Sequence, residues 1–264
     1  MQGHLQKMPV HMDEGEVVHY HLPLDDQQIS LNPLLGKKVS LEYLGDIHCL
    51  QCGRVTRKSY AQGYCYPCMK KLARCDSCII KPELCHYAEG TCREPEWGKS
   101  QCFIPHVVYL ANSSGLKVGI TRAHHTLNRW IDQGAFQALP LLTVVDRLTS
   151  GQVEVLLKKQ LNDRTDWRKM LRGEPPKVDL LAQRQRLQQE YGELPGTWGT
   201  VDKVTTVRYP VLAYPDKVRS HNLEKEPLLE GTLLGIKGQY LIFDQAVINI
   251  RKYTGYRVKF TADL

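Results

Sequence analysis

Two pairs of cysteines in the first third of the chain have the spacing of a metal centre. Cys49 and Cys52 form one CxxC motif, and Cys65 and Cys68 form another, with twelve residues between the pairs. A CxxC motif directs two thiolates toward one point, and four thiolates make the tetrahedral ligand set that structural zinc prefers. We therefore expect a zinc ribbon here. A redox dithiol or an iron site is the alternative use of the same motifs.

A second group of cysteines follows and allows more than one arrangement. Its simplest use is a second tetrahedral zinc site formed by Cys75, Cys78, Cys85 and Cys92. His86 or Cys102 can replace one of these ligands, and an iron–sulfur cluster would need the same number of thiolates. Either metal would be structural, because four protein ligands leave no position for a substrate.

Residues 106–135 place three residues capable of phosphate chemistry on successive expected elements. Tyr109 lies in an apolar strand, Lys117 in a second strand after a turn, and Arg129 in the helix that follows. Glu154 lies in the next helix. A phenol can position water, a guanidinium binds two phosphate oxygens, and a carboxylate can hold a divalent metal. Taken singly, each of these residues is better explained as a core tyrosine or as a residue on a helix surface.

In their order, these residues resemble the opening of the GIY-YIG nuclease domain. Val107-Val108-Tyr109 stands where the first motif belongs, and Lys117-Val118-Gly119 stands where the second belongs. The resemblance implies that Tyr109 activates or positions the attacking water, that Arg129 holds the scissile phosphate, and that Glu154 binds a catalytic Mg²⁺ or Mn²⁺. The second motif usually has a tyrosine at the position of Lys117, whose ammonium would bind phosphate or lower the pKa of Tyr109.

The whole chain resembles, more specifically, a bacterial family of unknown function. Members of that family join a cysteine-rich N-terminal region to a GIY-YIG-like domain. The segments CREPEWG (Cys92–Gly98) and GIKGQYLIFD (Gly235–Asp244) carry this likeness. The likeness implies a fold and no particular activity.

Basic residues interleaved with aromatic ones point to nucleic acid as a partner. Residues 47–75 contain no acidic residue, and tyrosines separate six basic ones, namely Arg54, Arg57, Lys58, Lys70, Lys71 and Arg74. We expect further contacts from Arg122, Lys237, Arg251 and Lys252. Cations attract the phosphate backbone, and exposed aromatic rings stack on bases. A solvated surface beside core aromatic residues is the competing interpretation of either basic segment alone.

The bulk properties are those of a globular, cytoplasmic protein. The chain has 264 residues, nine cysteines and a net charge of +7. No segment approaches the roughly 18 uninterrupted apolar residues of a membrane span. The N-terminus lacks the apolar core of a secretory signal. The oligomeric state and the cellular pathway do not follow from the sequence.

The elements that must position these residues indicate an α+β fold. We expect a β segment at 1–46, a cysteine-rich zinc module at 47–103, a GIY-YIG-like α/β domain at 104–196 and a β-rich domain resembling a small barrel at 197–264. The N-terminal strands would complete the barrel. In the third segment, periodicity predicts strands at 107–111, 116–121 and 141–148, and helices at 126–133, 150–161, 166–171 and 178–191.

Three functions are consistent with these features. The first is a metal-dependent endonuclease acting on DNA or structured RNA. The second is a zinc-ribbon protein that binds nucleic acid or a ribonucleoprotein without cutting it. The third is a redox or iron–sulfur sensor that uses the cysteines between Cys75 and Cys102.

Overall fold

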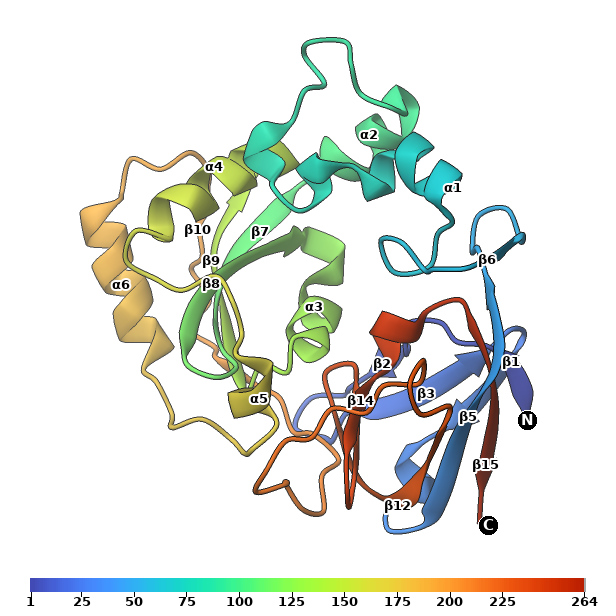
Figure 1. Ribbon diagram of the computed structural model, residues 1–264. Helices are drawn as coiled ribbons and strands as arrows, with labels where there is room; N and C mark the ends of the chain where they lie inside the picture. Colours follow the sequence, from blue (N-terminus) through green and yellow to red (C-terminus); the bar gives the residue numbers. More distant parts are fainter. Residues whose placement is uncertain (264) are drawn as a thin grey trace. The chain divides into compact units, whose positions relative to one another are not determined.

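The computed structural model describes residues 1–263 as a mixed α+β chain (Figure 1). The chain forms two compact units. Unit 1 contains residues 1–70, 171–173 and those from 208 onward, and unit 2 contains residues 71–170 and 174–207. The α+β class expected from the sequence is confirmed. The two ends of the chain lie in the same unit. The finer division into four segments stays a prediction.

Unit 1 is built on a seven-stranded antiparallel sheet that joins both ends of the chain. In spatial order it runs β1 (Gln2–His4), β15 (Tyr256–Ala262), β5 (Lys38–His48), β12 (Leu228–Lys237), β13 (Tyr240–Phe243) and β14 (Val247–Asn249), with β6 (Val55–Thr56) paired to the end of β5. The N-terminal strand thus lies beside the C-terminal one. A smaller sheet contains β2 (Val10–His11), β3 (His19–Leu24) and β4 (Gln27–Ser30).

The expected closed barrel does not form among the described strands. The sheet ends at β1 and β14, which do not pair with each other. The outer edge of β14 is instead used by a loop, because Val247 N–H donates to Arg219 O at 2.8 Å and Val247 O accepts from His221 N–H at 2.9 Å. This edge is therefore already hydrogen-bonded and offers no ladder to β1.

Unit 2 has a second sheet covered by helices. Its strands run in the order β10 (Thr197–Trp198), β9 (Gln137–Val144), β7 (His106–Asn112) and β8 (Leu116–Arg122), and β11 (Thr205–Thr206) also pairs with β9. Its helices are α2 (Pro95–Cys102), α3 (Thr126–Asp132), α4 (Arg147–Leu157), α5 (Trp167–Met170) and α6 (Leu180–Glu190).

The elements expected between residues 107 and 191 are present, with some ends displaced. The third strand covers Gln137–Val144 instead of 141–148. The Asp146 side chain accepts a hydrogen bond from Thr149 N–H at 2.8 Å. Asp146 is therefore the N-cap of α4, and the helix starts where the sequence pattern had extended the strand.

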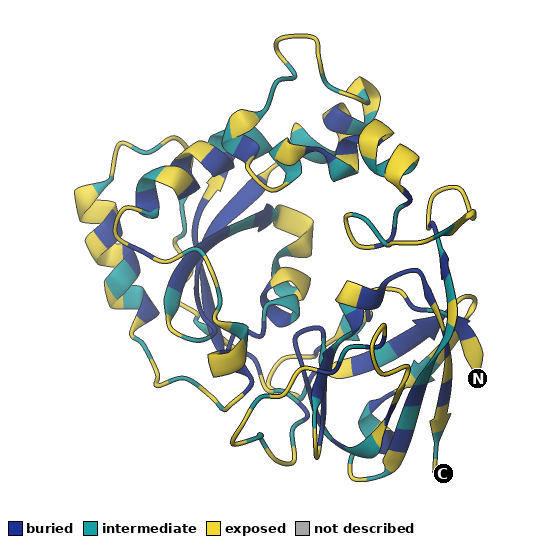
Figure 2. Ribbon diagram, viewed as in Figure 1, coloured by how far each residue is buried: buried dark blue, intermediate teal, exposed yellow. Residues whose placement is uncertain are grey.

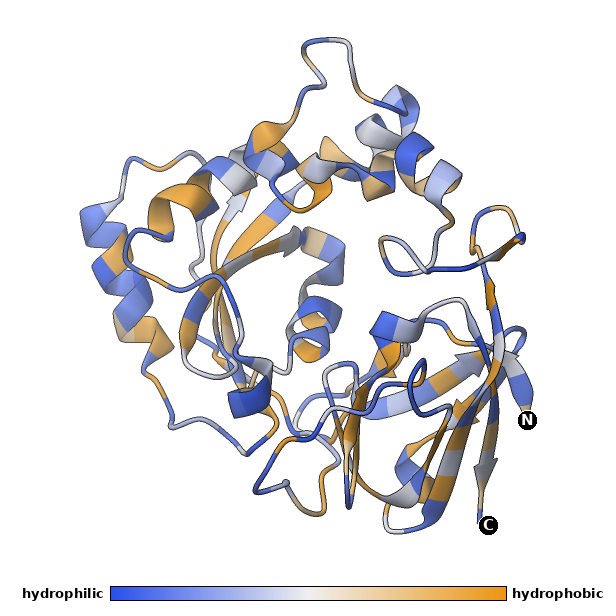
Figure 3. Cartoon of the chain, viewed as in Figure 1, coloured by the Kyte–Doolittle hydropathy of each residue, from blue (hydrophilic) through white to orange (hydrophobic). Residues whose placement is uncertain are grey.

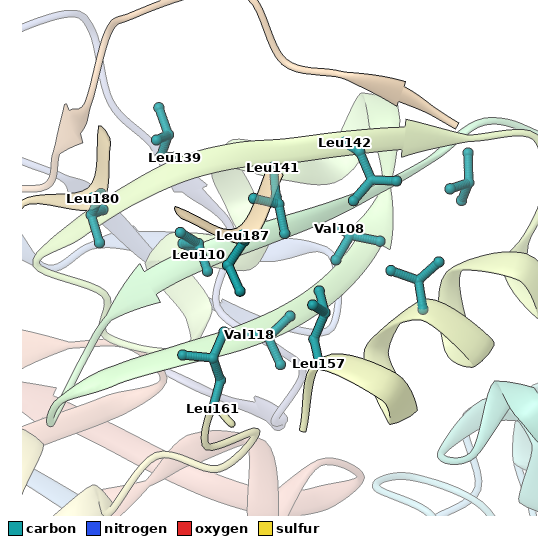
Figure 4. Packing of buried hydrophobic residues seen from close by; sticks show 12 residues of the cluster. Val108, Leu110, Val118, Leu139, Leu141, Leu142, Leu157, Leu161, Leu180 and Leu187 are labelled. Atoms are coloured by element: carbon teal, nitrogen blue, oxygen red, sulfur yellow. The ribbon is translucent and has the colours of Figure 1, made fainter. Parts of the chain in front are cut away.

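Alternation along β7 separates two apolar layers in unit 2. Val108 and Leu110 belong to a cluster with Leu157 of α4 and Leu187 of α6 (Figure 4). Tyr109 faces the other layer, where Trp130 of α3 lies edge-on with its ring centroid 6.0 Å away. All of β7 is buried (Figure 2). Because successive strand residues point to opposite faces, Tyr109 is directed to the α3 side.

Helix α6 shows how the outer layer is covered. Leu180 and Leu187 face the core, while glutamine and arginine side chains fill most of the remaining surface, so hydrophobic and hydrophilic residues mix along it (Figure 3). The helix is therefore held by one apolar stripe. Among residues 1–263 no helix has both the length and the apolar character needed to cross a lipid bilayer.

Candidate functional site

The four cysteines of the two CxxC motifs gather into one compact set in unit 1. Their sulfur atoms all lie within 4.8 Å of one another, and Cys52 Sγ lies 3.8 Å from Cys65 Sγ. Zinc binds thiolate sulfur at about 2.3 Å, so two sulfurs at the corners of a tetrahedron are about 3.8 Å apart. Cys49 and Cys65 are buried, Cys68 is half-buried and Cys52 is exposed, so the set lies at the edge of the unit. The geometry therefore fits structural zinc.

Local backbone geometry forms the first knuckle. β5 runs directly into Cys49, whose carbonyl accepts a hydrogen bond from Gly53 N–H at 2.8 Å. Gly53 has φ +69°, a left-handed conformation that glycine adopts without a Cβ penalty. On the other side, Met69 N–H donates to Cys65 O at 2.9 Å and starts α1 (Tyr66–Lys71). The hairpin between the motifs thus brings two preformed turns together.

The acid–base properties of the thiols call for a cation. Burial opposes ionisation of Cys49, but hydrogen bonds from the backbone N–H groups of Cys65, Cys52 and Gln51 lower its pKa to about 6. Burial and the neighbouring thiols raise the pKa of Cys68 to about 12. Four thiols this close cannot all ionise unless a positive ion lies between them.

Arg54 belongs to the surroundings of this centre. Its side chain donates a hydrogen bond to the Cys52 sulfur, which raises the pKa of Arg54. The guanidinium therefore offsets part of the thiolate charge. This contact competes with the phosphate contact expected from the sequence.

The second cysteine group is not arranged as expected. Among residues 1–263, Cys75, Cys85 and Cys92 do not join Cys78 in a similarly tight set; its compact neighbours are Asp76 and His86. Asp76 Oδ2 lies 2.7 Å from Arg93 Nε and 3.4 Å from His86 Nε2. Burial raises the pKa of Cys78 to about 11, which favours the neutral thiol. Asp76 thus forms an ion pair with Arg93 beside Cys78, and the expected four-thiolate site stays a prediction.

The structure brings the four expected phosphodiester-site residues into electrostatic contact in unit 2. Tyr109 is fully buried, and its hydroxyl has no hydrogen-bond partner of ordinary geometry among the described residues, although the Arg129 guanidinium and the Gln133 side chain lie close. Burial raises the pKa of Tyr109, and Arg129 opposes that rise. The phenol therefore stays protonated at neutral pH and can donate a hydrogen bond, but it cannot act as a base.

Gly119 makes room for the tyrosine. It pairs with Tyr109 in the β7–β8 ladder, and a Cβ at Gly119 would lie only 2.6 Å from the Tyr109 hydroxyl oxygen. The ring therefore lies across the bare backbone of the neighbouring strand. This close approach explains the glycine at the end of the Lys117-Val118-Gly119 motif.

The other two buried members of the set also have perturbed ionisation. Lys117 is 4% exposed, and burial together with Arg129 lowers its pKa to about 8, against the opposing effects of Glu154 and Asp163. Burial raises the pKa of Glu154. Arg129 is the exposed member. Groups with perturbed pKa values around one exposed cation are typical of functional sites.

A lysine missed by the sequence analysis occupies the place expected for a metal. Lys158 Nζ lies 3.3 Å from Glu154 Oε2 and 3.1 Å from Asp163 Oδ2. An ammonium thus joins two carboxylates that could otherwise bind a hard cation. The signal available in the sequence was the four-residue spacing between Glu154 and Lys158, which places both on one helix face.

Of the basic residues expected to contact nucleic acid, some are exposed and others donate hydrogen bonds within the protein. The exposed ones are Arg57, Lys58, Lys70, Lys71, Arg74 and Lys252. Arg122 Nε donates to Gln101 O at 3.0 Å, and Arg251 donates to the side chain of Gln62.

Lys237 corrects the sequence expectation. It is fully buried, with Nζ 3.0 Å from Gly173 O and 5.0 Å from the centre of the Tyr214 ring. The rings of Tyr209 and Tyr214, which precede this strand in the chain, lie against the cation, so Lys237 lies out of reach of a ligand on the surface.

Comparison with known proteins places the chain in one family. Neither a curated protein nor a solved structure matches it. Nothing in these comparisons links it to GIY-YIG nucleases. Residues 36–258 match DUF2797, described as a protein of unknown function. The match includes both the four-cysteine centre and the cluster around Tyr109, and on this evidence the chain belongs to the DUF2797 family.

Proposed function

We propose that this protein binds nucleic acid through its zinc ribbon. The supporting observation is the surface of the ribbon itself, where Arg57, Lys58 and Lys70 are exposed in a segment without acidic residues. The Tyr66 side chain is 54% exposed, and its ring lies edge-on to Tyr60 at 5.6 Å. The cations would contact phosphates, and the exposed ring would stack on a base.

Salt dependence tests this proposal. Replacing Arg57, Lys58 and Lys70 together with alanine is expected to weaken binding to labelled duplex DNA. The slope of log affinity against log salt should fall by about 0.9 for each phosphate that the variant no longer neutralises. Fluorescence anisotropy at several salt concentrations measures the slope, and the same titrations with single-stranded DNA and RNA identify the preferred partner.

A matched control separates the ribbon from overall charge. The triple variant Lys38→Ala, Lys217→Ala and Lys259→Ala removes the same charge from exposed positions elsewhere in unit 1. It should retain nearly the full slope. Equal weakening of both variants would mean that binding depends on net charge and that the ribbon has no special part in it.

We further propose that the bound phosphodiester is hydrolysed at the cluster around Tyr109. Its support is the convergence of a buried phenol, a buried ammonium and a buried carboxylate on the exposed Arg129. Arg129 would hold two phosphate oxygens, Lys117 would neutralise negative charge that develops on the phosphoryl oxygens, and the Tyr109 hydroxyl would orient the attacking water.

The carboxylates of Glu154 and Asp163 supply the hard oxygen ligands that Mg²⁺ or Mn²⁺ would need. Such an ion would generate hydroxide and stabilise the leaving oxygen. Binding a metal ion there would require Lys158 to move away from both carboxylates, with which it now forms ion pairs.

The position of Lys158 and the complete burial of Tyr109 favour a second function, binding without cleavage. Labelled DNA and RNA incubated with Mg²⁺ or Mn²⁺ distinguish the two. If hydrolysis is metal-dependent, Glu154→Gln should abolish cleavage while binding persists, and Lys158→Ala should lower the Mg²⁺ concentration needed. If the ammonium replaces the metal, cleavage should survive chelation and disappear in Lys158→Ala. Binding by every variant with no cleavage by wild type would leave only the binding function.

A further inference from the structure

We propose that His4, Asp46 and His48 form a second divalent-metal site in unit 1, separate from the four cysteines. One ligand atom from each residue lies within 4.8 Å of the others. His4 lies in β1, and the other two lie at the end of β5. Two imidazoles and one carboxylate are a common ligand set for divalent transition metals.

The sheet brings these distant residues together. β1 and β5 flank β15 on opposite sides, so that His4 and His48 approach each other at its start, with ring centroids 4.2 Å apart. Gly255 fixes both neighbouring strands. Its N–H donates to Leu5 O at 2.8 Å, and its carbonyl accepts from His48 N–H at 2.7 Å.

Only glycine suits that position. Gly255 has φ +89°, and a Cβ there would lie 2.5 Å from the His48 carbonyl oxygen. The backbone around the two histidines is therefore held by hydrogen bonds on both sides and by a close backbone approach. This preorganisation does not depend on a metal.

The separation of the ligand atoms fits a metal ion. His48 Nε2 lies 3.0 Å from Asp46 Oδ2. With metal–ligand bonds of about 2.1 Å, two ligands are about 3.0 Å apart at the right angle of an octahedral or square-planar ion and about 3.4 Å apart at the tetrahedral angle of zinc. A hydrogen bond would have the same length, so this distance is compatible with both arrangements.

His4 distinguishes the two arrangements. Its Nδ1 lies 2.8 Å from Asp25 Oδ1, so Nδ1–H donates to that carboxylate and Nε2 is the nitrogen that remains for a metal ion. That Nε2 is buried and has no hydrogen-bond partner among residues 1–263. A buried acceptor without a partner is costly, and a metal ion would satisfy it. In many metal sites, a carboxylate accepts a hydrogen bond from the histidine nitrogen that does not bind the metal, and so orients the ring, as Asp25 does for His4.

The ligand set also indicates the kind of ion and its access. Imidazole nitrogen favours zinc and neighbouring transition metals over Mg²⁺ or Ca²⁺. Three protein ligands leave at least one coordination position, and the side chains of His48 and Asp46 are 32% and 27% exposed. Water or an anionic group could therefore reach the metal, unlike in the four-cysteine centre.

Zinc stoichiometry tests the site in the full chain. After saturation with Zn²⁺ and removal of the excess, His4→Ala and Asp46→Asn should each contain one zinc per chain fewer than wild type. Asp25→Asn should keep the site but weaken it by about 10- to 100-fold. His11→Ala is the matched control, because His11 is an exposed histidine paired with Asp13 at 3.2 Å, and it should retain the wild-type count.

X-ray absorption identifies the ligands of the additional zinc. Wild type should show nitrogen or oxygen neighbours beside sulfur, and His4→Ala should show sulfur alone. The proposal is overturned if both His4→Ala and Asp46→Asn keep the wild-type count. It is also overturned if every zinc in wild type has only sulfur neighbours, because the histidine–aspartate contacts would then be hydrogen bonds alone. Circular dichroism and melting curves identify a variant that loses zinc by unfolding, and in that case the absorption spectrum of wild type decides.

Discussion

Cys65→Ser is expected to remove the ribbon zinc and to destabilise unit 1 severely. Cys65 is buried, and its sulfur lies 3.8 Å from that of Cys52. A serine hydroxyl does not ionise at neutral pH and cannot replace a thiolate ligand. Structural zinc contributes on the order of 10 kcal/mol to folding in isolated zinc modules. In a unit that also has a hydrophobic core, we expect a loss of at least about 3 kcal/mol.

Zinc content and thermal melting measure this effect together. Wild type should lose stability when a strong chelator is added, whereas Cys65→Ser should melt at one low temperature with or without chelator. Cys102→Ala is the control, because Cys102 lies in α2 of unit 2, outside the four-cysteine set. It should retain the ribbon zinc. A Cys65→Ser protein with unchanged zinc content and melting temperature would exclude a structural metal at this centre.

Lys117→Met is expected to stabilise unit 2 while it weakens function. Lys117 is 4% exposed, and burial lowers its pKa to about 8, so the folded state disfavours the ammonium. Methionine keeps the length of the side chain without the charge. We expect a gain of about 1–3 kcal/mol in the free energy of unfolding. If the cluster binds phosphate, the same change should reduce cleavage, or binding at this site, by at least about tenfold.

The pH dependence of stability provides a specific check. Between pH 8 and the usual lysine pKa, the unfolded chain keeps the Lys117 proton and the folded chain releases it. Wild type should therefore gain stability relative to Lys117→Met as the pH rises through this window. Urea denaturation of both proteins at several pH values measures the difference. A constant difference across the window would show that the ammonium is not destabilised in the folded state.

Features encoded by neighbouring residues could be predicted from the sequence alone. The four-cysteine centre is one, because each CxxC motif is a local turn and the segment between the motifs is short enough to form a hairpin. The order of strands and helices in unit 2 is another, because their apolar periodicity reflects burial of one face.

Other features depend on which side chains come into contact in the folded chain. Lys158 between Glu154 and Asp163 shows that a carboxylate selected as a metal ligand can be neutralised by a lysine on its own helix. Lys237 shows that a basic residue among tyrosines can lie inside them and not on a binding surface. In each case the side chain's partner is set by packing, which the composition of the segment does not specify.

The sequence by itself determined the four-cysteine centre and the α+β class, because both follow from the spacing of residues within single segments. Only the tertiary structure decided that the N-terminal strand lies beside β15, which brings His4 to Asp46 and His48. No motif in the sequence joined His4 to Asp46 and His48. Their meeting depends on strand pairing across the whole length of the chain, and this pairing is fixed by the hydrogen bonds and burial of the complete sheet.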